Sequence, residues 1–230
     1  MSEAPHGKNG WALVAGAGPG LGQALLQRFD RGQLHAVGVT RSAADSGFES
    51  HRCDLSDGTK AADLLGRLIE SYGPPKIVAH NTAQLVIQPF LETTPTEFEQ
   101  CWRSMVLSAV HVAQGVLQPM VRAGGGSFLV SGATASIRGG ARFAAFAQAK
   151  FALRGLTQSL AREFQPAGVH VAHVLLDGII DSPRSRELHT LDPSKMIDPD
   201  DLAEAYWQLA RQPSTTWTHE LDLRPRTESF

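Results

Sequence analysis

Short apolar runs alternate with longer amphipathic segments along most of the chain, and this alternation constrains the fold more than any other feature. We predict strands at residues 11–15, 34–39, 77–79, 127–131, 169–176 and 218–223, and helices at 21–31, 59–72, 96–121 (as one helix or two), 143–165 and 200–211. Strands that alternate with helices form βαβ units, and right-handed crossovers join such units into a doubly wound sheet. We therefore expect one α/β domain over residues 1–230, with a mainly parallel sheet and helices on both faces.

Composition narrows the class of protein. The 230 residues carry 21 basic and 23 acidic side chains, a net charge of −2, which argues against a nucleic-acid binder that relies on a basic surface. Two cysteines, Cys53 and Cys101, suit a reducing compartment. No apolar run approaches the roughly 20 residues of a membrane span, residues 1–10 lack a signal-peptide core, and no metal-ligand spacing stands out. We expect a cytoplasmic protein without nucleic-acid, membrane or metal partners.

One segment, residues 178–197, departs from the alternation. It mixes charges and prolines and has little periodicity. Connections of this length are usually lids or binding loops. We therefore expect it to shape a substrate site.

Four glycines gather within seven residues directly after the first predicted strand. Gly16, Gly18, Gly20 and Gly22 span the step into the next helix, which opens at Leu21. Glycines let a backbone approach a pyrophosphate, and a helix N-terminus offers free N–H groups and a positive dipole end. The alternative is a tight turn that binds no ligand. So many glycines in so short a stretch favour a dinucleotide site.

The end of the second predicted strand distinguishes between the two nicotinamide dinucleotides. An acidic residue here binds a ribose 2′-hydroxyl, whereas an arginine accommodates a 2′-phosphate. Residues 38–42 hold no Asp or Glu, and Arg41 is present. This favours NADP(H) over NAD(H); the alternative is an ordinary solvated loop arginine.

Further motifs follow the glycine loop in a characteristic order. They are Cys53-Asp54-Leu55, Ala79-His80-Asn81-Thr82-Ala83, the strand ending at Ser131, Phe146-Ala147-Gln148-Ala149-Lys150, Leu175-Leu176-Asp177-Gly178-Ile179 and Pro199-Asp200-Asp201-Leu202-Ala203. Together these motifs resemble the short-chain dehydrogenase/reductase family over nearly the whole chain. The resemblance implies a Rossmann-like fold, a nicotinamide cofactor, a small-molecule substrate and assembly as a homodimer or homotetramer through two long helices.

The resemblance also implies positions for the cofactor. The pyrophosphate would lie on Gly16, Gly18, Gly20, Leu21 and Gly22, the 2′-phosphate on Arg41, and the adenine near Asp54 and Leu55. The ribose next to the nicotinamide would meet Asn81, Thr82 and Lys150, and the nicotinamide itself would meet Gly178 and Ile179.

The catalytic positions depart from the family pattern of Asn, Ser, Tyr and Lys. The Tyr position holds Phe146, which has no ionisable proton, the Ser position holds Ala133, and the Asn position falls on Met105. Only Lys150 remains. A shifted register could restore a hydroxyl from Ser131, Thr134 or Ser136.

Other groups near the expected cleft could replace the missing acid. Asp177 stands where the family has a proline, and could act as an acid or base, anchor a cationic substrate, or simply cap a turn. His80 could donate a proton, or it could bond to the backbone. Arg138 and Arg142 could hold an anionic substrate, or belong to a solvated loop. Phe146 would form an apolar wall beside the nicotinamide.

Three functions remain open from the sequence. The first is an NADP(H)-dependent oxidoreductase with Lys150, Asp177 and Phe146 at an atypical active site, acting on an activated or imine-like acceptor. The second is a dinucleotide-binding sensor or partner protein without turnover. The third is a cyclase, isomerase or lyase on the same fold. The absence of the Tyr weakens the first function relative to the other two but does not exclude it.

Overall fold

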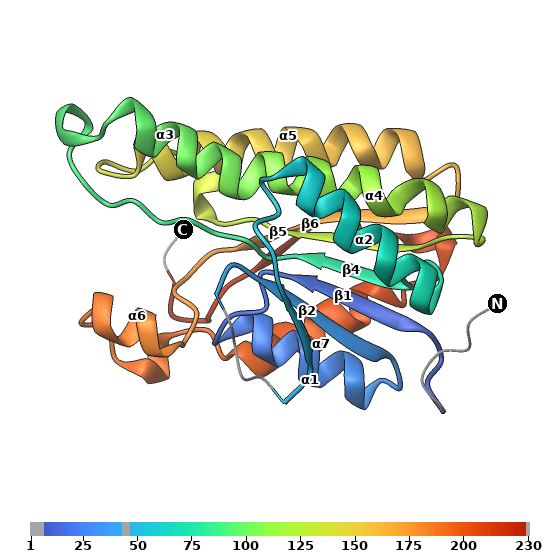
Figure 1. Cartoon of the computed structure of the whole chain (residues 1–230). Helices are drawn as coiled ribbons and strands as arrows, with labels where there is room; N and C mark the ends of the chain where they lie inside the picture. The colour runs from blue at the N-terminus through green and yellow to red at the C-terminus, as the bar shows by residue number, and fades with distance from the viewer. Residues whose placement is uncertain (1–6, 43–46, 229–230) are drawn as a thin grey trace.

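A seven-stranded parallel sheet forms the centre of the protein (Figure 1). The computed structural model describes residues 7–42 and 47–228; part of the polar start, residues 1–6, lies outside them. The strands are β1 (Trp11–Ala15), β2 (His35–Thr40), β3 (Glu49–Arg52), β4 (Ile77–His80), β5 (Gly126–Ser131), β6 (Val169–Leu176) and β7 (Glu220–Leu223), in the spatial order β3-β2-β1-β4-β5-β6-β7. Because the order reverses beside β1, the sheet is doubly wound, as predicted.

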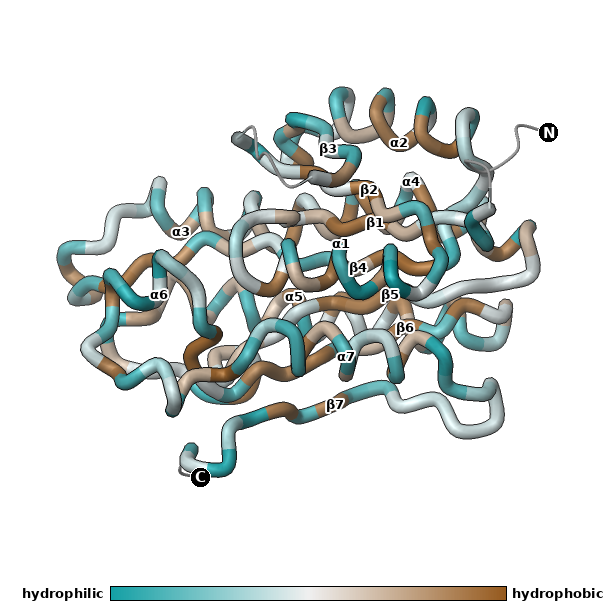
Figure 2. Tube along the Cα trace, turned by 90° about the horizontal axis from the view of Figure 1, so that it is seen from below, coloured by the Kyte–Doolittle hydropathy of each residue, from teal (hydrophilic) through white to brown (hydrophobic). Residues whose placement is uncertain are grey.

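Helices cover both faces of the sheet, which confirms the expected architecture. On one face lie α1 (Leu21–Arg31) and α7 (Pro199–Ala210), which pack against each other (Figure 2). On the other lie α2 (Gly58–Tyr72), α4 (Ser108–Arg122) and α5 (Ala144–Phe164). Each helix is the connection between two parallel strands, because the chain must run back to the end of the sheet where the next strand starts.

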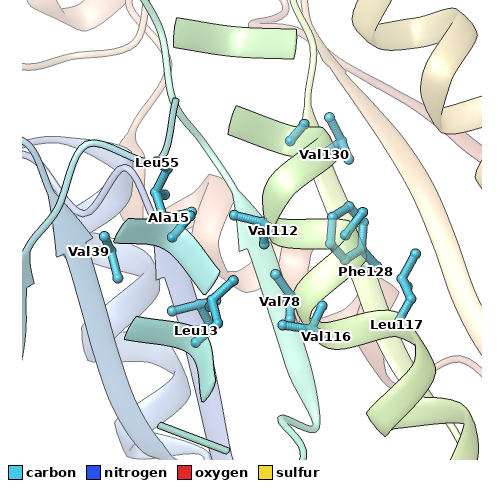
Figure 3. Packing of buried hydrophobic residues seen from close by; sticks show 14 of the residues in the cluster. Leu13, Ala15, Val39, Leu55, Val78, Val112, Val116, Leu117, Phe128 and Val130 are labelled. Carbon is cyan, nitrogen blue, oxygen red and sulfur yellow. The ribbon is translucent and has the colours of Figure 1, made fainter. Parts of the chain in front are cut away.

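The larger core lies between the sheet and α2, α4 and α5. Figure 3 shows Leu13, Val78 and Phe128 of the sheet facing Val112 and Val116 of α4, and all five are fully buried. Such burial stabilises the fold by roughly 1.5–3 kcal/mol for each large side chain. The strands read as continuous apolar runs because both of their faces are covered.

A sheet-edge strand and a π-helical turn were not predicted. The strand β3 has the sequence ESHR, without an apolar residue, because it lies at the sheet edge and is only partly buried. The predicted helix 96–121 is α3 (Pro95–Trp102) joined to α4 through a π-helical turn at Arg103–Leu107. A π turn leaves no periodic signal, since it widens a helix by one residue without interrupting it.

The combined helical run Pro95–Arg122 corrects the expectation that no segment could span a membrane. By length and composition alone it is apolar enough to do so. Half of its most apolar window is buried inside the protein, where Val112 and Val116 face the sheet. A helical run buried in this way is typical of a core helix of a folded domain.

The aperiodic segment 178–197 is partly ordered by local contacts. Ile180 and Ile197 form an isolated parallel bridge at its two ends. Between them lies the short helix α6 (Pro183–Leu188), whose first turn is capped by the Ser182 hydroxyl. A helix this short cannot show a reliable period, which explains why the sequence pattern missed it.

Candidate active site

Two adjoining cavities open at the carboxyl edge of the sheet, where ligands bind in open α/β folds. The glycine-loop cavity, of about 450 Å³, is lined by the loop before α1 and by the ends of β2 and β4. The Phe146 cavity, of about 600 Å³, is lined by the end of β5, the start of α5 and the chain after β6. Asn81 and Ile180 line both, so the two cavities are continuous.

The glycine loop serves the fold as well as the cavity. Gly16 has φ +92°, and a Cβ there would lie 2.6 Å from the Asn81 carbonyl oxygen. A Cβ on Gly22 would lie 2.4 Å from the Gly16 carbonyl oxygen. These two glycines are therefore required by packing within the chain. Gly18 lines the cavity and has nothing within 4 Å of an added Cβ, so it leaves bare backbone facing the open space.

The start of α1 presents an open helix N-terminus to this cavity. Its N-cap is Gly20, and no side chain caps its first turn. Gly20 and Leu21 both line the cavity. Free N–H groups and the positive end of the helix dipole make such a terminus an anion site, and the pyrophosphate of a dinucleotide fits it.

The predicted adenine-side residues converge on the other end of the glycine-loop cavity. Arg41, Asp54 and Leu55 all line it. The Arg41 guanidinium is exposed, and it donates a hydrogen bond to the Gln84 side-chain oxygen at 3.3 Å. The Asp54 carboxylate accepts hydrogen bonds from the Ser56 amide at 3.0 Å and the Ser56 hydroxyl at 2.8 Å, which fixes the turn at the cavity rim.

Asn81 and Thr82 lie where the two cavities meet. The Asn81 amide donates to the Gly16 carbonyl at 3.2 Å, so the loop after β4 is tied to the glycine loop. The Thr82 hydroxyl donates to the Ser104 carbonyl at 2.7 Å. Thr82 lines the glycine-loop cavity, but its hydroxyl hydrogen is already engaged.

His80 is not available as a proton donor at neutral pH. Its ring is fully buried, and burial, aided by the charge of Lys150, lowers its pKa to about 3. Its Nε2 lies 2.9 Å from the Ser108 hydroxyl, so the expectation of a backbone partner is also wrong. The ring is a neutral part of a buried polar cluster between β4 and α4.

Lys150 and Phe146 lie side by side at the inner wall of the Phe146 cavity, one helical turn apart on α5. Lys150 is 3% exposed, and its ammonium donates to the Ser131 carbonyl at 2.7 Å. The Lys150 nitrogen lies 5.7 Å from the centre of the Phe146 ring. Burial lowers the pKa of Lys150 to about 8. Phe146 and Ala133 therefore present only carbon to the space beside this cation.

The three hydroxyls near the Ser position are all engaged elsewhere. The Ser131 hydroxyl pairs with the Tyr206 hydroxyl at 2.7 Å, and the Ser136 hydroxyl accepts from the Ala133 amide at 3.1 Å. The Thr134 hydroxyl donates to Asp177. A shifted register therefore does not restore the missing hydroxyl.

Asp177 is committed to an ion pair, which argues against its expected role as an acid or base. It is 5% exposed, and one carboxylate oxygen accepts from Thr134. The other lies 3.2 Å from the guanidinium of Arg224. With the largely buried Arg224 guanidinium on one oxygen and the Thr134 hydroxyl on the other, both carboxylate oxygens are already engaged. Its contacts also differ from those of a turn cap, because the partners are side chains.

The other predicted residues lie at the Phe146 cavity or at an exposed turn, and a further buried histidine lies in the core. Gly178, Ile179 and Arg138 line the Phe146 cavity, whereas Arg142 is exposed at a turn with φ +70° and is not among the lining residues. His173 is buried in β6 beside the Ser136 hydroxyl, and burial lowers its pKa to about 4.

Several lining residues were missed. Ser104 and Ser108 reach the glycine-loop cavity from the π turn and α4, and Ser182, Arg184 and Ser185 reach it from the segment 178–197. Glu228 lines the Phe146 cavity from the far end of the chain. The aperiodic segment 178–197 marked the region of Ser182, Arg184 and Ser185 but not the individual residues. Nothing in the sequence marked Ser104, Ser108 or Glu228.

Comparison with known proteins matches this arrangement to a class of dinucleotide-dependent enzymes. Residues 10–190 match the short chain dehydrogenase family. L-xylulose reductase from Mesocricetus auratus is 30% identical over 169 residues, which cover 70% of this chain and 68% of the relative. The 3-oxoacyl-[acyl-carrier-protein] reductase MabA from Mycobacterium tuberculosis is 29% identical over 178 residues, which cover 76% of this chain and 71% of the relative.

Solved structures agree with the sequence matches. A short-chain dehydrogenase from Rhodopseudomonas palustris superposes with a TM-score of 0.76 at 30% identity, over 93% of this chain and 98% of that one. ElxO with NADP bound has the same fold, with a TM-score of 0.85 at 17% identity over 95% of this chain and 97% of that one. The chain belongs to the short-chain dehydrogenase/reductase family, whose members are oxidoreductases that bind nicotinamide cofactors.

Proposed function

We propose that this protein is an NADP(H)-dependent oxidoreductase whose acceptor takes hydride without proton donation by a tyrosine. One observation carries the proposal. A buried Lys150 lines the Phe146 cavity, while the acid position beside it is Phe146. Burying an ammonium group is unfavourable unless its partners offset the lost hydration, and the hydroxyls of a nicotinamide ribose would be such partners.

The described residues fit the dinucleotide. The uncapped start of α1 and the bare backbone of Gly18 suit the pyrophosphate, and Arg41 suits a 2′-phosphate. Lys150 would hold the nicotinamide ribose, with Asn81 opposite. When bound, the cofactor supplies the hydride.

The walls of the Phe146 cavity set the class of acceptor. A general acid contributes typically 10²- to 10⁴-fold in rate, and a neutral carbonyl needs one because its oxygen becomes negative. An iminium ion already carries a positive charge, so hydride addition to its carbon gives a neutral amine without a proton. The cavity is mostly apolar, with Phe143, Phe146 and Leu85 among its lining residues, so we propose a bulky apolar iminium or a comparably activated acceptor.

A structure of the same fold holds NADPH in a tyrosine-to-phenylalanine variant. A tyrosine-to-phenylalanine variant of ElxO is described with NADPH bound, at a TM-score of 0.84 and 16% identity to this chain. By analogy, we infer that Phe146 is compatible with a bound NADPH here.

Two measurements test the proposal. The first is a fluorescence titration with NADPH and with NADH, for the parent, for Arg41→Ala and for Arg162→Ala, an exposed arginine on α5 outside both cavities. We expect tighter NADPH binding, weakened about tenfold by Arg41→Ala. Equal affinity for the two nucleotides in all three proteins would refute the NADP(H) assignment.

The second measurement is NADPH oxidation with cyclic iminium ions and with ketones of similar size. We expect turnover of the iminium ions and little of the ketones. Tight NADPH binding with no oxidation on either set would favour the sensor function, which the loss of the Ser and Tyr positions also permits. Product formation without a net change in cofactor redox state would favour a non-redox enzyme.

A further inference from the structure

We propose that residues 224–228, which we call the C-terminal arm, form one wall of the Phe146 cavity, and that Asp177 is the positioning residue that anchors this arm. The inference rests on the proposed function only in taking the Phe146 cavity as the substrate site. It gives Asp177 a role that replaces the acid expected from the sequence.

The edge strand β7 delivers the arm to the cavity. β7 pairs in parallel with β6, and the Asp177 amide donates to the Leu223 carbonyl at 2.8 Å, just where both strands end. Both views show the chain after β7 leaving toward the end of the sheet where α6 lies (Figures 1 and 2). The first residue of the arm, Arg224, therefore starts beside Asp177.

A largely buried ion pair fixes this starting point. The Arg224 side chain is 17% exposed and that of Asp177 is 6% exposed, with 3.2 Å between guanidinium nitrogen and carboxylate oxygen. Arg224 also pairs with Asp222, whose side chain is about half exposed. The Thr134 hydroxyl donates to the second Asp177 oxygen. Asp177 thus links the β5 end, the β6 end and the arm.

The rest of the arm then turns back over the cavity. Pro225 lies against Gly178, where an added Cβ would come within 2.9 Å of the proline ring. The Glu228 amide donates to the Pro225 carbonyl at 2.9 Å, which closes a turn. Glu228 thereby lines the cavity together with His189 of the segment 178–197. A substrate in the cavity would touch both segments.

The ion pair positions the arm more than it holds the sheet together. The backbone bond between Asp177 and Leu223 already sets the β6–β7 register, and a proline at 177 would lack both the amide and the carboxylate. Desolvation offsets much of the attraction in a buried pair, but removing one partner leaves the other uncompensated. Loss of either charge should therefore release the arm.

Hydrogen exchange measured by mass spectrometry tests the anchor. The variants are Asp177→Asn, Arg224→Gln and the double variant, with Asp222→Asn as the control that removes only the more exposed partner of Arg224. We expect about tenfold faster exchange in peptides that cover the arm for each single variant, and no further gain in the double variant, because both remove one interaction. Additive effects, or equal effects of Asp177→Asn and Asp222→Asn, would overturn the anchoring role.

Cysteine labelling tests the wall. Ala133→Cys places a thiol inside the cavity, while burial raises the pKa of Cys53 and of Cys101 and keeps them slow to react. In this background we expect a bulky fluorescent maleimide to react about tenfold faster after Asp177→Asn than after Asp222→Asn. Equal labelling rates would show that the arm does not limit access.

NADPH titration of the same variants separates this inference from the proposed function. Arg224 lines neither cavity, so we expect Arg224→Gln to leave NADPH affinity unchanged. If no variant and no parent binds NADPH, the proposed function fails, whereas the exchange and labelling results still decide the role of the arm.

Discussion

Replacing Lys150 by methionine should change how stability depends on pH. Lys150 is fully buried, and its pKa falls from the usual 10.5 to about 8 because burial penalises the ammonium. That difference corresponds to about 3 kcal/mol of unfavourable free energy in the folded state at pH 7. Methionine has a similar length and carries no charge.

The direction of the pH effect follows from proton binding. Between pH 8 and 10.5 the unfolded chain holds the Lys150 proton and the folded chain has lost it. The free energy of unfolding therefore rises with pH across this window, and the full penalty is present below pH 8. In Lys150→Met this contribution is absent at every pH.

Urea denaturation at pH 7 and pH 10 measures the effect. The stability advantage of Lys150→Met over the parent should be about 2–3 kcal/mol larger at pH 7 than at pH 10. Other groups that titrate in this range cancel in the comparison. A difference between the two proteins that does not change with pH would refute the reasoning. NADPH should bind the variant more weakly if Lys150 holds the nicotinamide ribose as proposed.

Three further predictions concern the glycine loop, the buried histidine and the acid position. Gly22→Ala forces a Cβ to within 2.4 Å of the Gly16 carbonyl oxygen, so it should lower the unfolding free energy by about 1–3 kcal/mol and weaken NADPH binding. The control is Gly66→Ala in α2, where a Cβ meets open space; in the same thermal melts it should raise the unfolding free energy by about 0.5–1 kcal/mol. The pKa of His80 is about 3, so between pH 7 and pH 5 the unfolded chain gains a proton that the folded chain rejects. Over this range the parent should therefore lose about 2 kcal/mol more of its unfolding free energy than His80→Gln, as measured by urea denaturation at both pH values. Phe146→Tyr should raise the rate of NADPH oxidation by ketones about 10²- to 10⁴-fold and that by iminium ions hardly at all, and a gain of similar size on both would contradict the proposed acceptor class.

The sheet could be predicted from the sequence because its central strands are buried on both faces. Runs such as Trp11–Ala15 and Val169–Leu176 are almost wholly apolar, and their bounds were predicted as the structure has them. The edge strand Glu49–Arg52 escaped because an edge strand needs no apolar face. The hydrophobic pattern of the sequence thus predicts strands that are buried in the core. It misses an edge strand that forms only because a neighbouring strand pairs with it.

The candidate site was predictable only where its residues follow strand ends in order. Arg41, Asp54 and Asn81 could be placed at one edge because parallel strands bring their carboxyl ends together. The partner of Asp177 could not, because Arg224 lies far along the chain and its approach depends on β7. The π turn before α4 also affects which side chains line the cavity, and the hydrophobic periodicity of the sequence does not reveal such a turn.

The π turn at Arg103–Leu107 means that the chemistry of the glycine-loop cavity depends on residue count as well as residue identity. The turn accommodates one more residue than an α-helix, and it leaves Ser104 and Ser108 at the cavity with Met105 fully buried. Deleting a single residue there would return the turn to α-helical geometry with α3 and α4 still in register, and would change only which side chains the turn presents to the cavity. Relatives that are identical elsewhere in the helix could therefore present different side chains to a ligand through one insertion or deletion at this turn.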